Sequence, residues 1–80
     1  MKVATWNVNS IRARLKHVLK WLASTQADVL CLQETKCVDE KFPAGLISAA
    51  GYSAEFLGES SYNGVAILSK HPISNVEKKE

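Results

Sequence analysis

The apolar residues of this 80-residue chain change their spacing along the sequence, and that spacing predicts the first two elements. Residues 2–6, "KVATW", contain the β-branched and aromatic residues that favour a short strand. Between residues 10 and 23, apolar residues recur three or four positions apart, which is typical of a helix with one apolar face. Asn9 or Ser10 can cap this helix, because either side chain accepts a hydrogen bond from a backbone N–H.

The second half of the chain predicts three more strands and a second helix. Residues 28–33 form a mostly apolar run that predicts a strand. Residues 41–50 predict a short helix that begins at Pro43 and ends before Gly51. The remaining strands are expected at 52–57 and 65–69, joined as a hairpin by a turn at Asn63-Gly64.

The order strand, helix, strand, helix, strand, strand predicts an α/β fold. The first strand–helix–strand unit is right-handed in about 98% of cases and makes its two strands parallel. Asn7 follows the first strand and Glu34 follows the second. Because parallel strands end at one edge of a sheet, we expect these side chains to converge where open α/β sheets bind ligands.

The runs "VLCL" and "VAIL" predict a sheet that is covered on both faces, and Cys31 is expected to be a core thiol. Two short helices can cover one face. A further layer does not fit in 80 residues, and the last residues, "VEKKE", carry no structural end signal. The sequence therefore predicts an incomplete domain that lacks one covering layer.

Charge changes this picture by suggesting a partner. Residues 1–23 carry five basic residues and no acid, although the whole chain has a net charge of only +2. Such a cluster fits an anionic partner such as a phosphate backbone, or the solvated face of a helix. The start of the helix adds unpaired N–H groups beside Arg12, Arg14 and Lys16, where a phosphate can bind.

The cysteine spacing and the length of the apolar runs exclude some classes of protein. The two cysteines have neither redox nor zinc-ligand spacing, and no apolar run is long enough to cross a membrane. A cytoplasmic location is expected.

Glu34 is the first candidate for chemistry. Mg²⁺ keeps several waters and needs only one or two protein carboxylates, so a lone Glu at a strand end can bind it. The alternatives are a solvated strand end, a helix-capping residue or a salt bridge with Lys36. Asn7 and Asn9 are expected on the same side of an extended stretch, where they can hydrogen-bond a phosphate, a bound water or a neighbouring carboxylate. The alternative is that both shape the turn and cap the helix.

Three segments, "MKVATWNVNSIRARL", "DVLCLQETK" and "YNGVAILSK", together resemble the amino-terminal part of the exonuclease III family of apurinic/apyrimidinic (AP) endonucleases. That family belongs to the endonuclease/exonuclease/phosphatase superfamily. The resemblance covers almost the whole chain. It implies the amino-terminal part of a four-layer α/β sandwich, in which two packed sheets are flanked by helices and the second sheet is largely missing from this chain.

The resemblance also implies roles for individual residues. Glu34 corresponds to the ligand of the catalytic Mg²⁺, or of Mn²⁺ in its place, and Asn7 to an active-site residue. Asn9 stands where some relatives have an aspartate near the metal. Because asparagine carries no charge, the resemblance does not make Asn9 a metal ligand. The residues that correspond to DNA-contacting positions, or to positions beside the metal, are Asn9, Arg12, Ala13, Lys16, Lys36 and Tyr62.

The implied reaction is Mg²⁺-dependent hydrolysis of phosphodiesters at abasic sites and 3′ ends of duplex DNA by a monomeric enzyme. The family's remaining catalytic residues lie beyond position 80, so the 80-residue chain is expected to be inactive by itself. Two alternatives stay open. One is a non-catalytic fragment or DNA-binding module, and the other is a phosphoesterase acting on a different phosphodiester or phosphate ester.

Overall fold

The computed structural model describes residues 1–57 and 64–71. The elements are β1 (Val3–Asn7), α1 (Ile11–Thr25), β2 (Val29–Gln33), a 3₁₀ turn η1 (Asp39–Lys41), α2 (Ala44–Ala49), β3 (Ser53–Leu57) and β4 (Val65–Ser69). Every helix and strand expected from the sequence is present, with ends that shift by a few residues. Neither helix in these ranges has the length and apolarity needed to cross a bilayer.

The four strands form one mixed sheet in the order β1-β2-β4-β3. β1 and β2 are parallel, and β4 is antiparallel to both β2 and β3. These pairings confirm the predicted crossover unit and the predicted antiparallel pair. Gly64 has a φ of 112°, and Asn63, the other residue of the predicted turn, lies outside the described residues.

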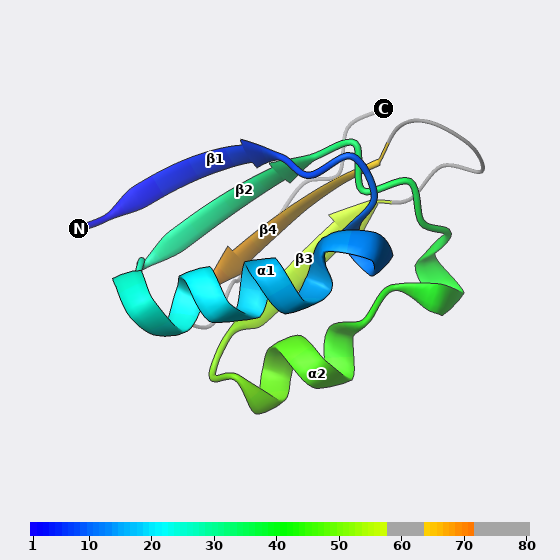
Figure 1. Ribbon diagram of the computed structural model, residues 1–80. Helices are drawn as coiled ribbons and strands as arrows, with labels where there is room; N and C mark the ends of the chain where they lie inside the picture. The colour runs from blue at the N-terminus through cyan, green and yellow to red at the C-terminus, as the bar shows by residue number, and fades with distance from the viewer. Residues whose placement is uncertain (58–63, 72–80) are drawn as a thin grey trace.

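Both helices lie on the same face of the sheet (Figure 1). Alternate strand residues point toward them, and Leu30 and Leu68, paired across β2 and β4, are fully buried. Ile11, Val18 and Leu22 of α1 pack onto this layer at the positions that the helical period predicts. Sheet and helices therefore form a two-layer α/β unit with its core between the layers.

The opposite face of the sheet, which we call the open face, is covered by neither helix. It exposes Val3 (63%), Val65 (52%) and Ile67 (39%). The half-buried Cys31 also lies on it, because alternation along β2 turns the leucines on either side toward the helices. The prediction that Cys31 is a core thiol is therefore wrong, and Cys37 is the buried cysteine.

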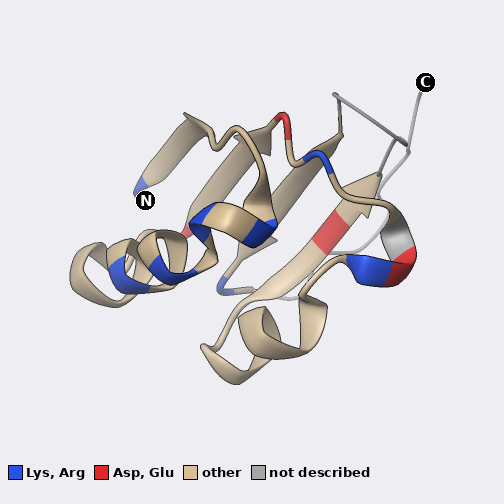
Figure 2. Ribbon diagram, turned by 45° about the vertical axis from the view of Figure 1, so that its right-hand side comes forward, with Lys and Arg blue, Asp and Glu red and all other residues tan. Residues whose placement is uncertain are grey.

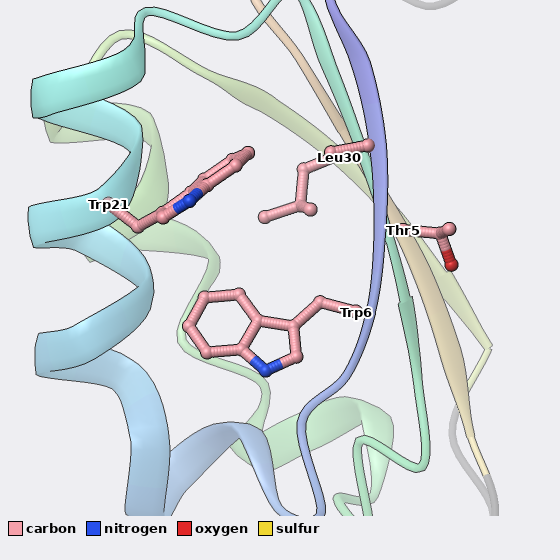
Figure 3. A pocket seen from close by; sticks show the side chains of 5 residues that line it. Thr5, Trp6, Trp21 and Leu30 are labelled. Carbon is pink, nitrogen blue, oxygen red and sulfur yellow. The ribbon is translucent and has the colours of Figure 1, made fainter.

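Trp6 and Trp21 pack edge to face between β1 and α1, with their ring centroids 6.2 Å apart. Both are partly buried and pack against the core. They line a hollow of about 210 Å³ together with Leu30, while the side chain of Thr5 points away from the helix (Figure 3). The lining of this hollow contains none of the residues expected to carry chemistry.

Charged groups meet at the amino end of β2, opposite the edge where Asn7 and Glu34 were expected. The backbone N–H of Lys2 donates to Asp28 Oδ2 (2.7 Å), and His71 Nε2 lies 3.6 Å from Asp28 Oδ1. The Lys2 N–H is the main reason that the pKa of Asp28 falls below its usual range. These contacts tie the amino terminus to the end of β4.

Candidate functional site

Asn7 and Glu34 meet at the carboxyl edge of β1 and β2, as the parallel arrangement predicts. Asn7 is the last residue of β1 and is paired with Gln33, the residue before Glu34. Asn7 Nδ2 donates a hydrogen bond to Glu34 Oε2. The Glu34 side chain remains 42% exposed, so its carboxylate is both oriented and accessible to a ligand.

Two further side chains join this pair. Lys36 Nζ donates to Asn9 Oδ1 and lies 3.9 Å from Glu34 Oε1. The backbone N–H of Asn9 donates to Asn7 Oδ1 (3.2 Å). We call these four residues the edge cluster. The salt bridge considered for Glu34 is present, but at this exposure such a pair contributes only about 1 kcal/mol or less.

The backbone in the two turns that carry the edge cluster is unusual. Asn9, Ser10, Glu34 and Lys36 all have left-handed φ values, between 49° and 94°. This conformation costs a residue with a side chain about 1–2 kcal/mol. Gln26, which caps α1, is the only other non-glycine case in the described part of the chain. Left-handed residues concentrate at sites where the surrounding structure imposes them, which supports a functional role for this edge.

Asn9 also corrects an expectation, because with a φ of 49° it is not part of an extended stretch. Alternation therefore does not explain why it lies beside Asn7. The turn itself brings Asn9 back, through its N–H to Asn7 and its side chain to Lys36.

The turns after β1 and β2 are joined by backbone hydrogen bonds. Ser10 N donates to Glu34 O and Ile11 N to Thr35 O, each at 2.9 Å. The N–H of Ala13 is bound by Ser10 Oγ at 3.3 Å. The prediction that these helix-start amides are available to a phosphate is therefore wrong for all three donors. The N–H groups of Ser10 and Ile11 fix the segment that carries Glu34 instead, and Ser10 Oγ caps the helix.

The expected DNA-contacting residues are divided between helix and turn. Arg12, Ala13 and Lys16 are exposed on the first turns of α1, and Lys36 belongs to the edge cluster. Figure 2 shows basic residues along α1 and no acidic residue on it. The start of α1 therefore places positive charge next to the edge cluster. Tyr62 lies outside the described residues.

Thr35 and Gly64 were not singled out from the sequence as site residues. Thr35 is 1% exposed although it is polar, and its N–H donates to Gly64 O at 3.1 Å. Two signals could have indicated them: a threonine directly after the candidate ligand, and a glycine after an asparagine at a turn.

The donor set at the edge suits a hard cation. Among the described residues, no three His, Cys, Asp or Glu side chains gather as a metal-binding group. Glu34 contributes one accessible carboxylate, and Asn7 Oδ1 already accepts a hydrogen bond. Mg²⁺ is commonly bound through one or two carboxylates and retained waters, so the residues present fit it as part of a ligand set.

Comparison with known proteins identifies the family. A sequence profile of the Endonuclease/Exonuclease/phosphatase family matches residues 4–79. The chain belongs to this family. The zebrafish (Danio rerio) DNA repair nuclease APEX1 is 38% identical over 95% of the chain. The AP endonuclease of Archaeoglobus fulgidus has a TM-score of 0.94 at 45% identity over 96% of the chain. The Neisseria 3′ phosphatase NExo, bound to a product DNA hairpin, has a TM-score of 0.91 at 43% identity over 94%.

These findings confirm the resemblance drawn from the sequence motifs and the α/β fold class. The relatives of this family that resemble the chain are hydrolases of phosphate esters, with nucleases among them. The chain spans between 26% and 30% of the length of these three proteins. The family match therefore covers nearly all of the chain but only part of each relative.

Proposed function

We propose that residues 1–80 form the amino-terminal portion of a single endonuclease/exonuclease/phosphatase domain that acts on DNA. The domain would hydrolyse phosphodiesters at abasic sites and 3′ ends with Mg²⁺, or with Mn²⁺ in its place. The observation that supports this most directly is the bond between Asn7 and Glu34, which orients one accessible carboxylate at the carboxyl edge of the sheet.

Each member of the edge cluster has a distinct part in the proposal. Glu34 binds the metal, which when present neutralises charge on the phosphoryl oxygens. Asn7 holds the Glu34 carboxylate through its amide N–H. Lys36 adds an ammonium group beside that carboxylate, where it can pair with a phosphate oxygen. Asn9 fixes the position of Lys36 without adding charge. The group that activates water belongs, on the family resemblance, to residues beyond position 80.

Duplex DNA is the proposed partner, because it would present phosphates to both the edge cluster and the start of α1. The relatives named above include one solved with product DNA and one named as a DNA repair nuclease. A monomeric state of the complete domain and a cytoplasmic location stay predictions.

A non-catalytic, DNA-binding role for the 80-residue chain is the second candidate. Among the described residues, the edge cluster contains one accessible carboxylate, and no group of three metal-binding side chains is present. This incomplete ligand set favours a non-catalytic role. A phosphoesterase with a different substrate is a further alternative, since one relative is a 3′ phosphatase.

A hybrid enzyme tests the proposal. In it, residues 1–80 replace the matching segment of the Archaeoglobus AP endonuclease, to which they are 45% identical. We expect the hybrid to incise a duplex that contains an abasic-site analogue when Mg²⁺ is present, and the isolated chain to leave it intact. The measurement is the rate of product formation on a denaturing gel, with and without a chelator.

The unaltered Archaeoglobus enzyme is the control for the hybrid, and circular dichroism establishes that the hybrid is folded. A folded hybrid that does not incise DNA contradicts the proposed function. Metal-dependent incision by the 80-residue chain alone contradicts the expectation that it is inactive.

The basic start of α1 leads to a separate prediction. Replacing Arg12 by alanine in the hybrid should weaken duplex binding and lower the salt slope, d log K/d log[salt], by about 1, because one phosphate contact and its counterion are lost. Fluorescence anisotropy at several salt concentrations measures the slope. Lys20→Ala is the matched control, because Lys20 is exposed on the same helix about 12 Å further along. Equal slopes for the two variants would remove Arg12 from the DNA interface.

A further inference from the structure

The residue after Glu34 is fixed from two sides. Thr35 N donates to Gly64 O (3.1 Å), at the start of β4, and Thr35 O accepts from Ile11 N (2.9 Å), at the start of α1. Its side chain is 1% exposed. Thr35 therefore links the turn that carries the proposed metal ligand to two other elements of the fold.

Gly64 lies so close to Thr35 that a side chain at position 64 would displace one of the two residues. A Cβ atom there would lie 2.3 Å from Thr35 Oγ1 and 3.5 Å from the backbone nitrogen of Lys36. Gly64 also has a φ of 112°. Gly51 provides a natural comparison, because its φ is 93° but no atom lies within 4 Å of the position that its Cβ would take.

The close contact has a direct consequence for Glu34. Glu34 and Lys36, on either side of Thr35, have φ values of 53° and 51°. Residues with side chains keep such values only when their surroundings impose them. If Thr35 moved away from Gly64, Glu34 would be free to return to an extended conformation, and its carboxylate would no longer face Asn7.

We infer that Gly64 and Thr35 are positioning residues, which hold the Glu34 carboxylate against Asn7 through their packed contact. The relevance of this contact to metal binding rests on the proposed function. The geometric part, that the contact between Gly64 and Thr35 maintains the bond between Asn7 and Glu34, holds without any metal.

The side-chain amide signal of Asn7 in a ¹H–¹⁵N NMR spectrum of the 80-residue chain tests the geometric part. Glu34→Ala marks the position that the Asn7 signal takes when its acceptor is removed. We expect Gly64→Ala to shift the Asn7 signal most of the way to that position. Gly51→Ala, which imposes a similar backbone cost in open space, should leave the signal where the wild type has it. An unmoved signal in Gly64→Ala, or equal shifts in the two alanine variants, overturns the inference.

A second pair of variants keeps the test decisive if Gly64→Ala does not fold. Thr35→Ser retains the side-chain hydroxyl and should keep the Asn7 signal at its wild-type position, whereas Thr35→Ala should displace the signal. Identical signals in the two Thr35 variants overturn the inference.

Mn²⁺ alone is the probe for the metal part. In the wild-type chain we expect Mn²⁺ to broaden the signals of Glu34 and Asn7. The Gly64→Ala variant should require about 10-fold more Mn²⁺ for the same broadening, because a metal ligand that loses its orienting partner typically binds the metal more weakly by this factor or more. Gly51→Ala should match the wild type. Absence of broadening in the wild type, with the Asn7 shifts as expected, counts against the proposed metal site and leaves the positioning role intact. Broadening that is equal in wild type and Gly64→Ala counts against the positioning role.

Discussion

Replacing Glu34 by alanine in the hybrid enzyme should lower Mg²⁺ affinity and the rate of DNA incision by at least about 100-fold. Loss of a residue that merely orients a metal ligand typically costs 10–100-fold, so loss of the carboxylate itself should cost at least as much. The fold should change little, because the side chain is 42% exposed and lies outside the buried core. The measurement is the incision rate across a Mg²⁺ titration, together with a thermal melt.

Glu40→Ala is the matched control for this prediction. Glu40 is an exposed carboxylate on η1, outside the edge cluster, and its loss removes the same charge. An incision rate that depends on Mg²⁺ identically in the Glu34 and Glu40 variants would contradict the proposed ligand role. A Glu34→Ala variant that melts far below the wild type would instead indicate a structural role.

The elements of the fold and the meeting of Asn7 with Glu34 could be predicted because each depends on local patterning. The apolar period of residues 10–23 determines which face of α1 is buried, and the crossover rule makes β1 and β2 parallel. The carboxyl ends of those two strands then share an edge, and a hydrogen bond joins the predicted pair there. Apart from the crossover rule, the prediction of the Asn7–Glu34 pair used no information about contacts between distant segments.

The remaining features depend on contacts between distant segments. Glu34 has a left-handed backbone conformation, and its carbonyl accepts a hydrogen bond from the Ser10 N–H. Both features arise only when the turns after β1 and β2 pack together. The placement of Cys31 could not be derived either, because an unbroken apolar run gives no indication of which strand face meets the helices. The contact between Gly64 and Thr35 joins positions 29 residues apart, and no periodicity signals it.

Adjacent residues of β4 should differ sharply in their effect on stability. Leu68 is 0% exposed and pairs with Leu30, whereas Ile67 is 39% exposed on the open face. Leu68→Ala should lower the free energy of unfolding of the 80-residue chain by about 2–5 kcal/mol, because it leaves a cavity in the core. For a domain stabilised by about 0.05–0.15 kcal/mol per residue, this is a large fraction of the total. Urea denaturation of both variants measures the difference, and Ile67→Ala should cost about 1 kcal/mol or less.

The same pair of variants in the hybrid tests what covers the open face. If the second sheet of the proposed domain packs there, Ile67 becomes buried, and Ile67→Ala should then cost nearly as much as Leu68→Ala. The cost of Leu68→Ala should be similar in chain and hybrid, because the helices already cover Leu68 on the other face. If the cost of Ile67→Ala in a folded hybrid stays at its value in the 80-residue chain, this result would contradict the proposal that these residues belong to a larger domain with a second sheet.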